Sequence, residues 1–474
     1  MELEIRPPDP EEKAYRISVV VLAILMALVV VLQFWGAWAH HRVSGPDGAN
    51  REQAITSGDM YVKCWVAWPQ RVFAKYAQEA YERARPWPSA YRRIGVLKQA
   101  TGKHGLADLQ KIDLPKTLHG LDLSKQQIAK LHREKTMWQH VYGPEKLTAN
   151  DATRYAADIR KLNLGPLKTP AISFVYQKAG LTKMADRVTR QARSSNQMAL
   201  GIAGVLIALL MLSGAAGLVI AVFFLATVAP RFWNGPLTRI RPSALITSFV
   251  IYLASYIGIG AAADVLGEAA GVDLKGSSSG ALFMGLTIVA AALAWAIALT
   301  ALLVRLRPGE GLREIGYRTV SAGRDALWGL AGYISSLPFL FVAAIVTAFL
   351  MNTVFRRIST PQQPFGEMVS KGSTLDVIFV FIGASIVAPI VEETFFRGVL
   401  YSAFRGRMGV WPSIAITSAL FAVIHPLPGG FLIIFTLACV LALLRERSGS
   451  LLPGMVCHGI YNTVGLIVAG LLMQ

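Results

Sequence analysis

Long apolar stretches separated by short polar ones run through most of the chain. A membrane-spanning helix needs about 20 apolar residues, because each residue adds about 1.5 Å and the hydrocarbon core is about 30 Å thick. Stretches that reach or approach this length fall at residues 17–38, 198–229, 243–264, 279–304, 328–352, 374–404, 411–425, 430–444 and 451–472. The last few are short or broken by charges. We therefore expect an all-α polytopic membrane protein with eight or nine transmembrane helices.

One long segment, 39–196, departs from this pattern. It is largely polar, its apolar residues recur at helical spacing, and Pro and Gly lie between the repeating stretches. This pattern predicts a helical soluble domain inserted between the first two spans. The expected order is a cytoplasmic N-terminal tail (1–16), the first transmembrane helix (17–38), the helical soluble domain (39–196), further transmembrane helices (197–324) and a C-terminal transmembrane domain (325–474).

Composition supports the membrane assignment and limits the partners. Of the 474 residues, 53% are hydrophobic and 16% charged, and the mean hydropathy is +0.45, outside the balance of soluble domains. The net charge is +18, and most of it comes from the soluble segment, which has 27 Lys and Arg against 13 Asp and Glu. No glycine-rich loop, RNA-binding signature or zinc spacing accompanies this charge. It favours solvent or the anionic headgroups of the lipid bilayer as its contacts, and no nucleic acid.

The loops indicate an orientation. Arg-rich loops are expected on the cytoplasmic side, and they lie at 230–242, 304–318, 404–409 and 445–450. The loop at 263–280 carries one lysine and three acids. We therefore expect a multi-pass integral membrane protein, of the plasma or inner membrane if bacterial. Residues 39–196 are expected on the non-cytoplasmic side, since long loops translocate largely regardless of charge.

Three charges interrupt one predicted span. The stretch VAPIVEETFFRGVLYSAFRGR contains Glu392, Glu393 and Arg397. A charge at the centre of a spanning helix costs about 2.5–3.5 kcal/mol, so it indicates a functional group unless a partner neutralises it. Glu393 and Arg397 are one helical turn apart and can form a structural ion pair. Glu392 points about 100° round the helix and has no such local partner.

Two later stretches supply polar groups that Glu392 can meet. His425 ends the apolar helix SALFAVIH, with Phe421 one turn before it, and His458 and Asn462 share one face of the helix MVCHGIYNTVG. Counted from the Arg-rich loops, these groups all lie at depths of about 14–21 Å. The sequence therefore predicts one polar pocket that opens toward the cytoplasm.

The three motifs resemble those of a known family. EETFFR is an EExxxR motif, FAVIH is FxxxH and HGIYN is HxxxN. Their order and spacing resemble the CaaX prenyl endopeptidase and bacteriocin-processing (CPBP) family of intramembrane proteases. The resemblance covers roughly residues 325–472. It implies that 325–474 is the catalytic transmembrane domain, that the helices in 197–324 are non-catalytic, and that the protein is an intramembrane endopeptidase.

Peptide hydrolysis needs an activated water and stabilisation of the oxyanion. Glu392 is predicted to be the base, with the water held by His425. His458 and Asn462 are predicted to donate to the oxyanion, as the resemblance also implies. The sequence contains no HExxH helix. No serine or cysteine stands at a matching position of the three motifs, which argues against catalysis by a serine or cysteine nucleophile. The residues expected to support the site are Glu393, Arg397 and Phe421.

A metal is left open. Glu392, His425 and His458 can form a His₂Glu zinc site with one position for water. The same groups can activate water directly, and the metal-independent glutamate mechanism is favoured. The expected substrate is a membrane peptide or a lipidated protein, because the site lies inside the bilayer.

Two non-enzymatic interpretations compete with a protease. A membrane immunity or binding protein could retain the polar pocket without using it. A transporter coupled to protons or ions also places glutamates and histidines in its spans. Transporters commonly show internal repeats, however, and residues 198–352 contain no second copy of the motifs.

Overall fold

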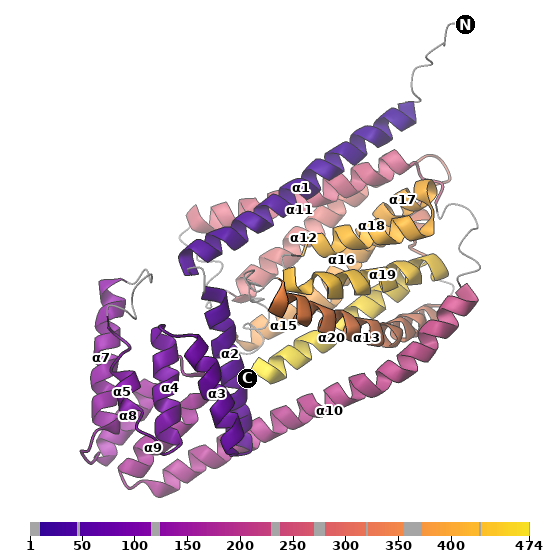
Figure 1. Ribbon diagram of the computed structural model, residues 1–474. Coiled ribbons are helices and arrows are strands. Elements are labelled where there is room, and N and C mark those ends of the chain that lie inside the picture. The colour runs from indigo at the N-terminus through magenta and orange to yellow at the C-terminus, as the bar shows by residue number, and fades with distance from the viewer. Residues whose placement is uncertain are drawn as a thin grey trace, which may run out of the picture. The chain divides into compact units, whose positions relative to one another are not determined.

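A computed structural model gives the architecture (Figure 1). It describes residues 10–44, 48–114, 124–228, 238–269, 280–318, 321–354, 372–425 and 428–473. All regular elements in these ranges are helical, so the predicted all-α fold is confirmed. Two of the loops that predict the orientation, 230–242 and 263–280, lie mostly outside the described residues.

The chain divides into two compact units. A helical unit comprises Gly36–Val205, and a membrane unit comprises Met1–Trp35 together with Leu206–Gln474. Helix α10 (Thr182–Val228) is one continuous element of 47 residues that begins in the first unit and ends in the second. The sequence placed a boundary at 196, inside this helix.

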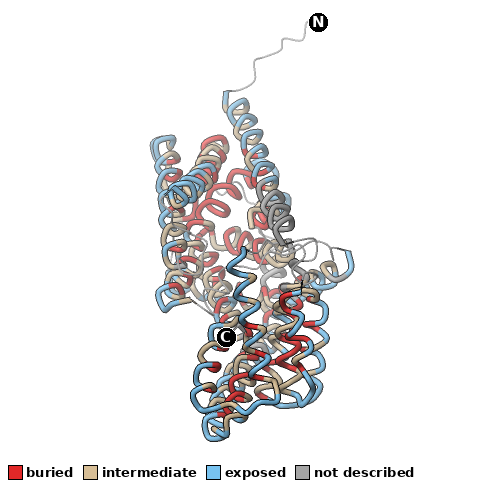
Figure 2. The backbone as a smooth tube through the Cα atoms, turned by 90° about the vertical axis from the view of Figure 1, so that its left-hand side faces the viewer, coloured by how far each residue is buried: buried red, intermediate tan, exposed pale blue. Residues whose placement is uncertain are grey.

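The helical unit folds around its own core. Two of its helices begin with capping boxes, in which the side chains of Ser124 and Thr148 each accept a hydrogen bond from the backbone three residues later. Trp138 and Tyr81 are fully buried in its centre, and Figure 2 shows the buried residues on the inner faces of the helices. The elements of the unit are α2 (Gly48–Ala67), α3 (Arg71–Arg83), α4 (Pro88–Ala100), α5 (Leu106–Leu109), α7 (Lys125–Tyr142), α8 (Ala149–Lys161), η1 (Gly165–Leu167), α9 (Lys168–Lys178) and the first part of α10.

The membrane unit is a bundle of long apolar helices. Six of them are long and apolar enough to cross a membrane, counted over the described residues. The residues of these candidate spans are Pro10–Val31, Pro242–Ala269, Ala281–Leu303, Ala322–Met351, Thr374–Met408 and Leu452–Leu471. They lie on α1 (Pro10–Ser44), α11 (Pro242–Ala269), α12 (Gly280–Leu303), α13 (Ala322–Thr353), the segmented helix 374–408 and α20 (Leu452–Met473).

The other three predicted spans fall on helices that do not meet the same criterion. The stretch 198–229 is the second part of α10, whose apolar part Leu212–Val222 runs over residues that are partly outside the description. Helix α18 (Val410–Val423) has 14 residues and α19 (Phe431–Ser448) has 18, ending in Arg445 and Arg447. At about 1.5 Å per residue, α18 reaches only about 21 Å.

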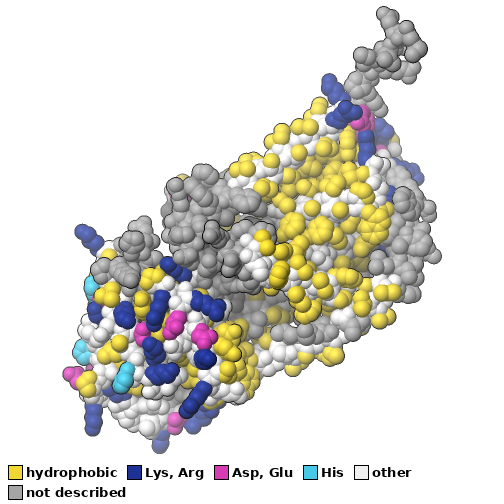
Figure 3. Space-filling model, in the orientation of Figure 1, with side chains coloured by type: hydrophobic (Ala, Val, Ile, Leu, Met, Phe, Trp, Pro, Cys, Tyr) yellow, Lys and Arg dark blue, Asp and Glu magenta, His cyan; other side chains and the backbone are white. Residues whose placement is uncertain are grey.

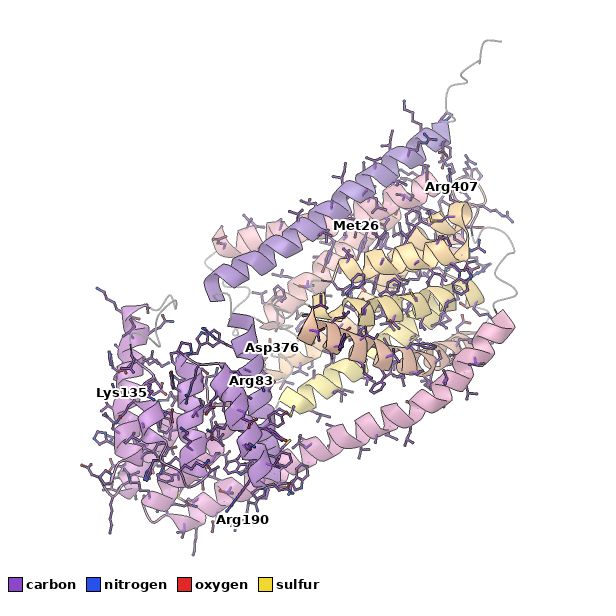
Figure 4. The ribbon with its side chains drawn as sticks, in the orientation of Figure 1. Met26, Arg83, Lys135, Arg190, Asp376 and Arg407 are labelled. Carbon is purple, nitrogen blue, oxygen red and sulfur yellow. The ribbon has the colours of Figure 1, made fainter. Side chains whose placement is uncertain are left out.

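Helix α1 contacts the rest of the membrane unit through both polar and apolar side chains. Glu12 pairs with Arg407 at the end of α17 (Tyr401–Met408), and Ser18 is 2.9 Å from Thr247 of α11. Met26 is buried in the main core cluster, and Figure 4 shows Met26 and Arg407 at these contacts. In Figure 3 the visible outer face of the membrane unit is covered by hydrophobic side chains, as a lipid-facing surface requires.

The helix that carries the charges is not a regular α-helix. It runs as α15 (Thr374–Ile382), a π-helical segment η4 (Gly383–Val387), α16 (Ala388–Glu392), a second π-helical segment η5 (Glu393–Leu400) and α17. The sequence predicted one span here and did not reveal these interruptions. Each π turn inserts an extra residue, which rotates the following side chains relative to an α-helix. The second segment begins at Glu393, directly after Glu392, so the carboxylate pair stands at the junction of two helix geometries.

Candidate active site

The two glutamates have opposite environments. Glu393 is 0% exposed at its side chain, whereas the Glu392 side chain is 20% exposed. Within the described residues, Oε2 of each glutamate is buried and has no hydrogen-bond partner. A buried oxygen without a hydrogen-bond partner lowers the stability of the fold, so its presence calls for a functional explanation. A buried, paired glutamate therefore stands beside a partly accessible one.

Arg397 compensates the charge of Glu393, as the sequence predicted. Its Nη1 donates to Glu393 Oε1 at 2.9 Å, and Nη2 donates to the Ala438 carbonyl at 3.2 Å. The guanidinium also lies over the Phe421 ring, 4.3 Å from its centroid. These contacts join the charged helix to α18 and α19. They also satisfy donors of the guanidinium, which a buried arginine requires in order to be stable.

His458 on α20 links the two glutamates. Its Nδ1 lies 3.2 Å from Glu393 Oε1, and its Nε2 lies 3.9 Å from Glu392 Oε2. If Nδ1 carries the proton and donates to Glu393, Nε2 of a neutral imidazole is left as an acceptor facing Glu392. The distance of 3.9 Å is longer than a hydrogen bond but lets one water molecule reach both atoms.

Phe421 separates the two histidines. Its ring centroid is 4.8 Å from that of His425 and 5.9 Å from that of His458. His425 Nδ1 lies 2.7 Å from the Phe421 carbonyl, to which it can donate. This bond directs the other nitrogen, Nε2, away from its own helix as an acceptor. The FxxxH motif thus contributes a histidine whose orientation is set by the phenylalanine one turn earlier.

Asn462 anchors α20 to the first π-helical segment. Its Nδ2 donates to the Ala384 carbonyl at 2.7 Å. One turn earlier, a Cβ on Gly459 would stand 2.7 Å from the Ser385 carbonyl, so only glycine permits this approach. The amide of Asn462 has two hydrogens, and this bond uses one of them.

A hydroxyl network that the sequence analysis missed holds the start of the second π-helical segment. Thr394 Oγ1 donates to the Ile390 carbonyl at 2.6 Å. The same oxygen lies 2.6 Å from the Tyr317 hydroxyl and 3.3 Å from the Trp295 indole nitrogen. A threonine hydroxyl donates once and accepts twice, so its capacity is used in full. No motif marks Tyr317 or Trp295, because their role depends on a loop and a helix far away in sequence.

Aromatic side chains on α11 pack against the two phenylalanines that follow the glutamate pair. Tyr252 stacks on Phe395 with ring centroids 4.2 Å apart. Tyr256, one turn further along α11, stacks on Tyr252 with ring centroids 6.3 Å apart. Tyrosines in a span carry no motif signal, and these ring contacts are a product of helix packing.

The structure thus brings Glu392, Glu393, Arg397 and His458 into one cluster, with His425 one aromatic ring away. It does not gather the proposed zinc ligands into a metal site: within the described residues, no three His, Cys, Asp or Glu side chains are grouped closely enough to hold a metal ion. The zinc alternative on Glu392, His425 and His458 stays a prediction.

Comparison with known families locates the resemblance. Residues 374–464 match the family model of the Rce1-like type II CAAX prenyl endopeptidases. The matched range contains the EExxxR, FxxxH and HxxxN motifs. The family resemblance predicted from these motifs is therefore confirmed for this part of the chain.

Two curated proteins are similar to part of this chain. An uncharacterized 24.3 kDa protein of Escherichia coli is 31% identical over 137 residues, which are 28% of this chain and 63% of that protein. The Bacillus subtilis (strain 168) protein named "Putative membrane peptidase YdiL" is 26% identical over 167 residues, which are 35% of this chain and 65% of that protein. The matched regions cover less than two thirds of either relative. No solved structure matches the chain.

Proposed function

We propose that the membrane unit is an intramembrane endopeptidase that hydrolyses a peptide bond in a membrane-associated or lipidated substrate. The observation that carries this proposal is the distance of 3.9 Å between Glu392 Oε2 and His458 Nε2. Both are acceptors when the histidine is neutral, so one water molecule can donate a proton to each of them. Its lone pairs then point away from both side chains and toward a substrate carbonyl.

The reaction proceeds in two steps. Glu392 takes a proton from the water as the oxygen attacks the carbonyl carbon, which forms a C–O bond and moves the π electrons to the carbonyl oxygen. The tetrahedral intermediate then collapses, the C–N bond breaks, and Glu392 returns its proton to the leaving amine. Glu392 is suited to this role because it is the more accessible of the two glutamates.

His458 is assigned a different role from the one its motif suggested. The HxxxN motif predicted that His458 donates to the oxyanion. The Nδ1 contact with Glu393 holds the ring so that Nε2 faces Glu392, where it can position the water. Glu393, neutralised by Arg397, keeps this ring in place, as a carboxylate does for many functional histidines.

Asn462 is proposed to stabilise the oxyanion. One of its amide hydrogens holds the Ala384 carbonyl, which sets the direction of the side chain. The second hydrogen is available to the oxygen of the intermediate. A donor of this kind contributes about 10²–10³-fold to turnover in other hydrolases. His425, whose Nε2 is directed away from its helix, is the second group that can position the water.

A bound zinc ion on Glu392, His425 and His458 would polarise the carbonyl and activate the water. These residues supply the right donor atoms, but they do not form a three-donor group in the described part of the chain. In the proposed reaction the water is therefore activated by Glu392 without a metal ion. Metal content of the purified protein, together with activity before and after chelation, tests this choice.

The substrate class follows from the setting of the site. The cluster lies in the middle of the candidate span Thr374–Met408, so a peptide already held in the membrane reaches it most easily. A prenylated C-terminus is one such substrate, and the name of the matching family includes prenyl endopeptidases.

The deciding experiment compares Glu392→Gln with wild type on a panel of membrane-anchored peptides, each protein being checked for folding. Glutamine keeps the size and polarity of glutamate but cannot accept the proton, so turnover should be lost. Thr463→Val serves as the control, because the Thr463 hydroxyl bonds only within its own helix among the described residues. Full activity of Glu392→Gln would refute the mechanism. A folded wild type that cleaves no peptide would favour the binding or immunity interpretation.

A further inference from the structure

The helical unit carries an exposed aromatic surface on its first two helices. We define the aromatic face as Tyr61, Trp68, Val72 and Tyr76, which are 38%, 43%, 42% and 45% exposed. The Tyr61 and Tyr76 rings lie against each other with centroids 5.5 Å apart. Figure 3 shows hydrophobic side chains gathered at the edge of this unit where α2 and α3 lie, beside Lys and Arg.

Helix geometry puts these four side chains on one surface. Tyr61 and Trp68 are seven residues apart, two turns along α2, and the Trp68 amide still donates to the Cys64 carbonyl at 2.8 Å as in a helix. Val72 and Tyr76 are one turn apart on α3. The two helices form a hairpin whose turn lies at residues 68–70, so the aromatic face runs from this turn up both arms.

A hydrogen bond ties the turn to a particular level of α10. Gln197 Nε2 donates to the Ala67 carbonyl at 2.9 Å. Gln197 ends the polar stretch TRQARSSNQ, and the apolar run MALGIAGVLIALLML begins at Met198. Three large apolar side chains near the start of that run, Met198, Ile202 and Val205, are exposed. Trp68 therefore lies at the level where the sequence of α10 changes from polar to apolar.

We propose that the aromatic face contacts the headgroup region of the bilayer and holds the helical unit against the membrane surface. Trp and Tyr concentrate in this region because their rings prefer the apolar boundary while their polar atoms stay hydrated. Arg71 and Lys75 lie beside the face, Arg71 exposed and Lys75 with 72% of its side chain accessible. Cations in this position are attracted by anionic headgroups. The occupant is the lipid bilayer, and the contact does not depend on the peptidase activity.

The bilayer fits better than a protein partner because the face ends at the level where the apolar run of α10 begins. The bond between Gln197 and the Ala67 carbonyl sets this level, and Met198, Ile202 and Val205, near the start of that run, are exposed. A protein-binding patch would need no such alignment with the start of the apolar run of α10.

Photo-crosslinking in the full chain tests the proposal. The amino acid p-benzoylphenylalanine is introduced at Trp68, Tyr76 or Val72, one position per protein, and at Arg83 as the control. Arg83 is exposed at the opposite end of α3, eleven residues or about 17 Å from Val72. Each protein is irradiated in nanodiscs of phosphatidylcholine and phosphatidylglycerol and in its cellular membranes, and the adducts are identified by mass.

We expect adducts of lipid mass at positions 68, 72 and 76 and none at position 83. Lipid adducts of equal yield at position 83 would overturn the proposal, because the face would then be no closer to the bilayer than the rest of the unit. Protein adducts without lipid adducts at 68 and 76 would overturn it in favour of a protein partner. Absence of lipid adducts from all three positions would overturn it as well. Three positions are used so that one misfolded variant does not decide the outcome.

Discussion

Nδ1 of His458 lies 3.2 Å from Oε1 of Glu393, the same oxygen that accepts the hydrogen bond from Arg397. The second glutamate of the EExxxR motif is therefore bound to the HxxxN motif and not only to its own arginine. This contact places α20 next to the π-helical segment that begins at Glu393. It also gives Glu393 two functions, compensation of a buried arginine and orientation of a histidine.

Glu393→Gln should lower both stability and activity. The substitution keeps the side-chain shape but leaves the Arg397 charge buried without a counter-ion, a loss of about 3–5 kcal/mol in the free energy of unfolding. Activity should fall by about 10–100-fold because His458 is held less firmly. The double variant Glu393→Gln with Arg397→Met removes the unpaired charge. It should regain thermal stability without regaining activity. A single variant as stable as wild type would contradict this account.

Asn462→Ala should act on catalysis more than on stability. Losing the bond to the Ala384 carbonyl costs about 1 kcal/mol, whereas losing an oxyanion donor costs about 10²–10³-fold in turnover. Steady-state hydrolysis and thermal unfolding are measured on the same preparations. If turnover falls only in proportion to the folded fraction, Asn462 is a structural residue and not a donor.

Thr394→Val should destabilise the membrane unit, because valine keeps the shape but removes the oxygen shared by Tyr317, Trp295 and the Ile390 carbonyl. The expected loss is about 1–3 kcal/mol for buried groups left without a partner. Thr394→Ser keeps the hydroxyl and serves as the matched control. In a double-mutant cycle with Tyr317→Phe, non-additive changes in the unfolding midpoint would confirm the bond, and simple additivity would argue against it.

Asp59→Ala should unfold the helical unit selectively. Both Asp59 oxygens accept from Arg93, whose side chain is 3% exposed, and Oδ1 also accepts from the Tyr81 hydroxyl. Removing the carboxylate leaves a buried arginine without a counter-ion, at a cost of about 3–5 kcal/mol. Limited proteolysis should then cut within 39–196. Glu79→Ala, which breaks only an exposed pair with Lys75, should change little.

The orientation predicted from the loops is tested by thiol accessibility. Single cysteines placed at Lys125, in the helical unit, and at Pro236, in the Arg-rich loop, should react with a membrane-impermeant reagent from opposite sides of the membrane. The reason is the concentration of arginine in short loops on the cytoplasmic side. Labelling of both positions from one side would exclude the predicted topology.

Patterns of neighbouring residues were sufficient to predict the helical class, most of the spans and the Glu393–Arg397 pair. A helical span needs only a run of apolar side chains long enough to cover its own backbone polar groups. An i, i+4 ion pair is likewise determined by helix geometry within one segment. The three motifs also predicted that Glu392, His425 and His458 belong to a common site, because their depths could be counted from the loops, and the structure places His458 Nε2 3.9 Å from Glu392 Oε2.

Contacts between distant segments were decided only by the tertiary structure. The π-helical segments around Glu392 pack against α11, α12 and α20, and no local sequence pattern predicted them. Packing also turned His458 toward Glu393 and brought Tyr317 to Thr394 across 77 residues of sequence. The physical reason is that a side chain's residue type and depth follow from the sequence of its own helix. Its direction, and the neighbour it meets there, follow from the rotation of each helix in the bundle, which many weak contacts set together.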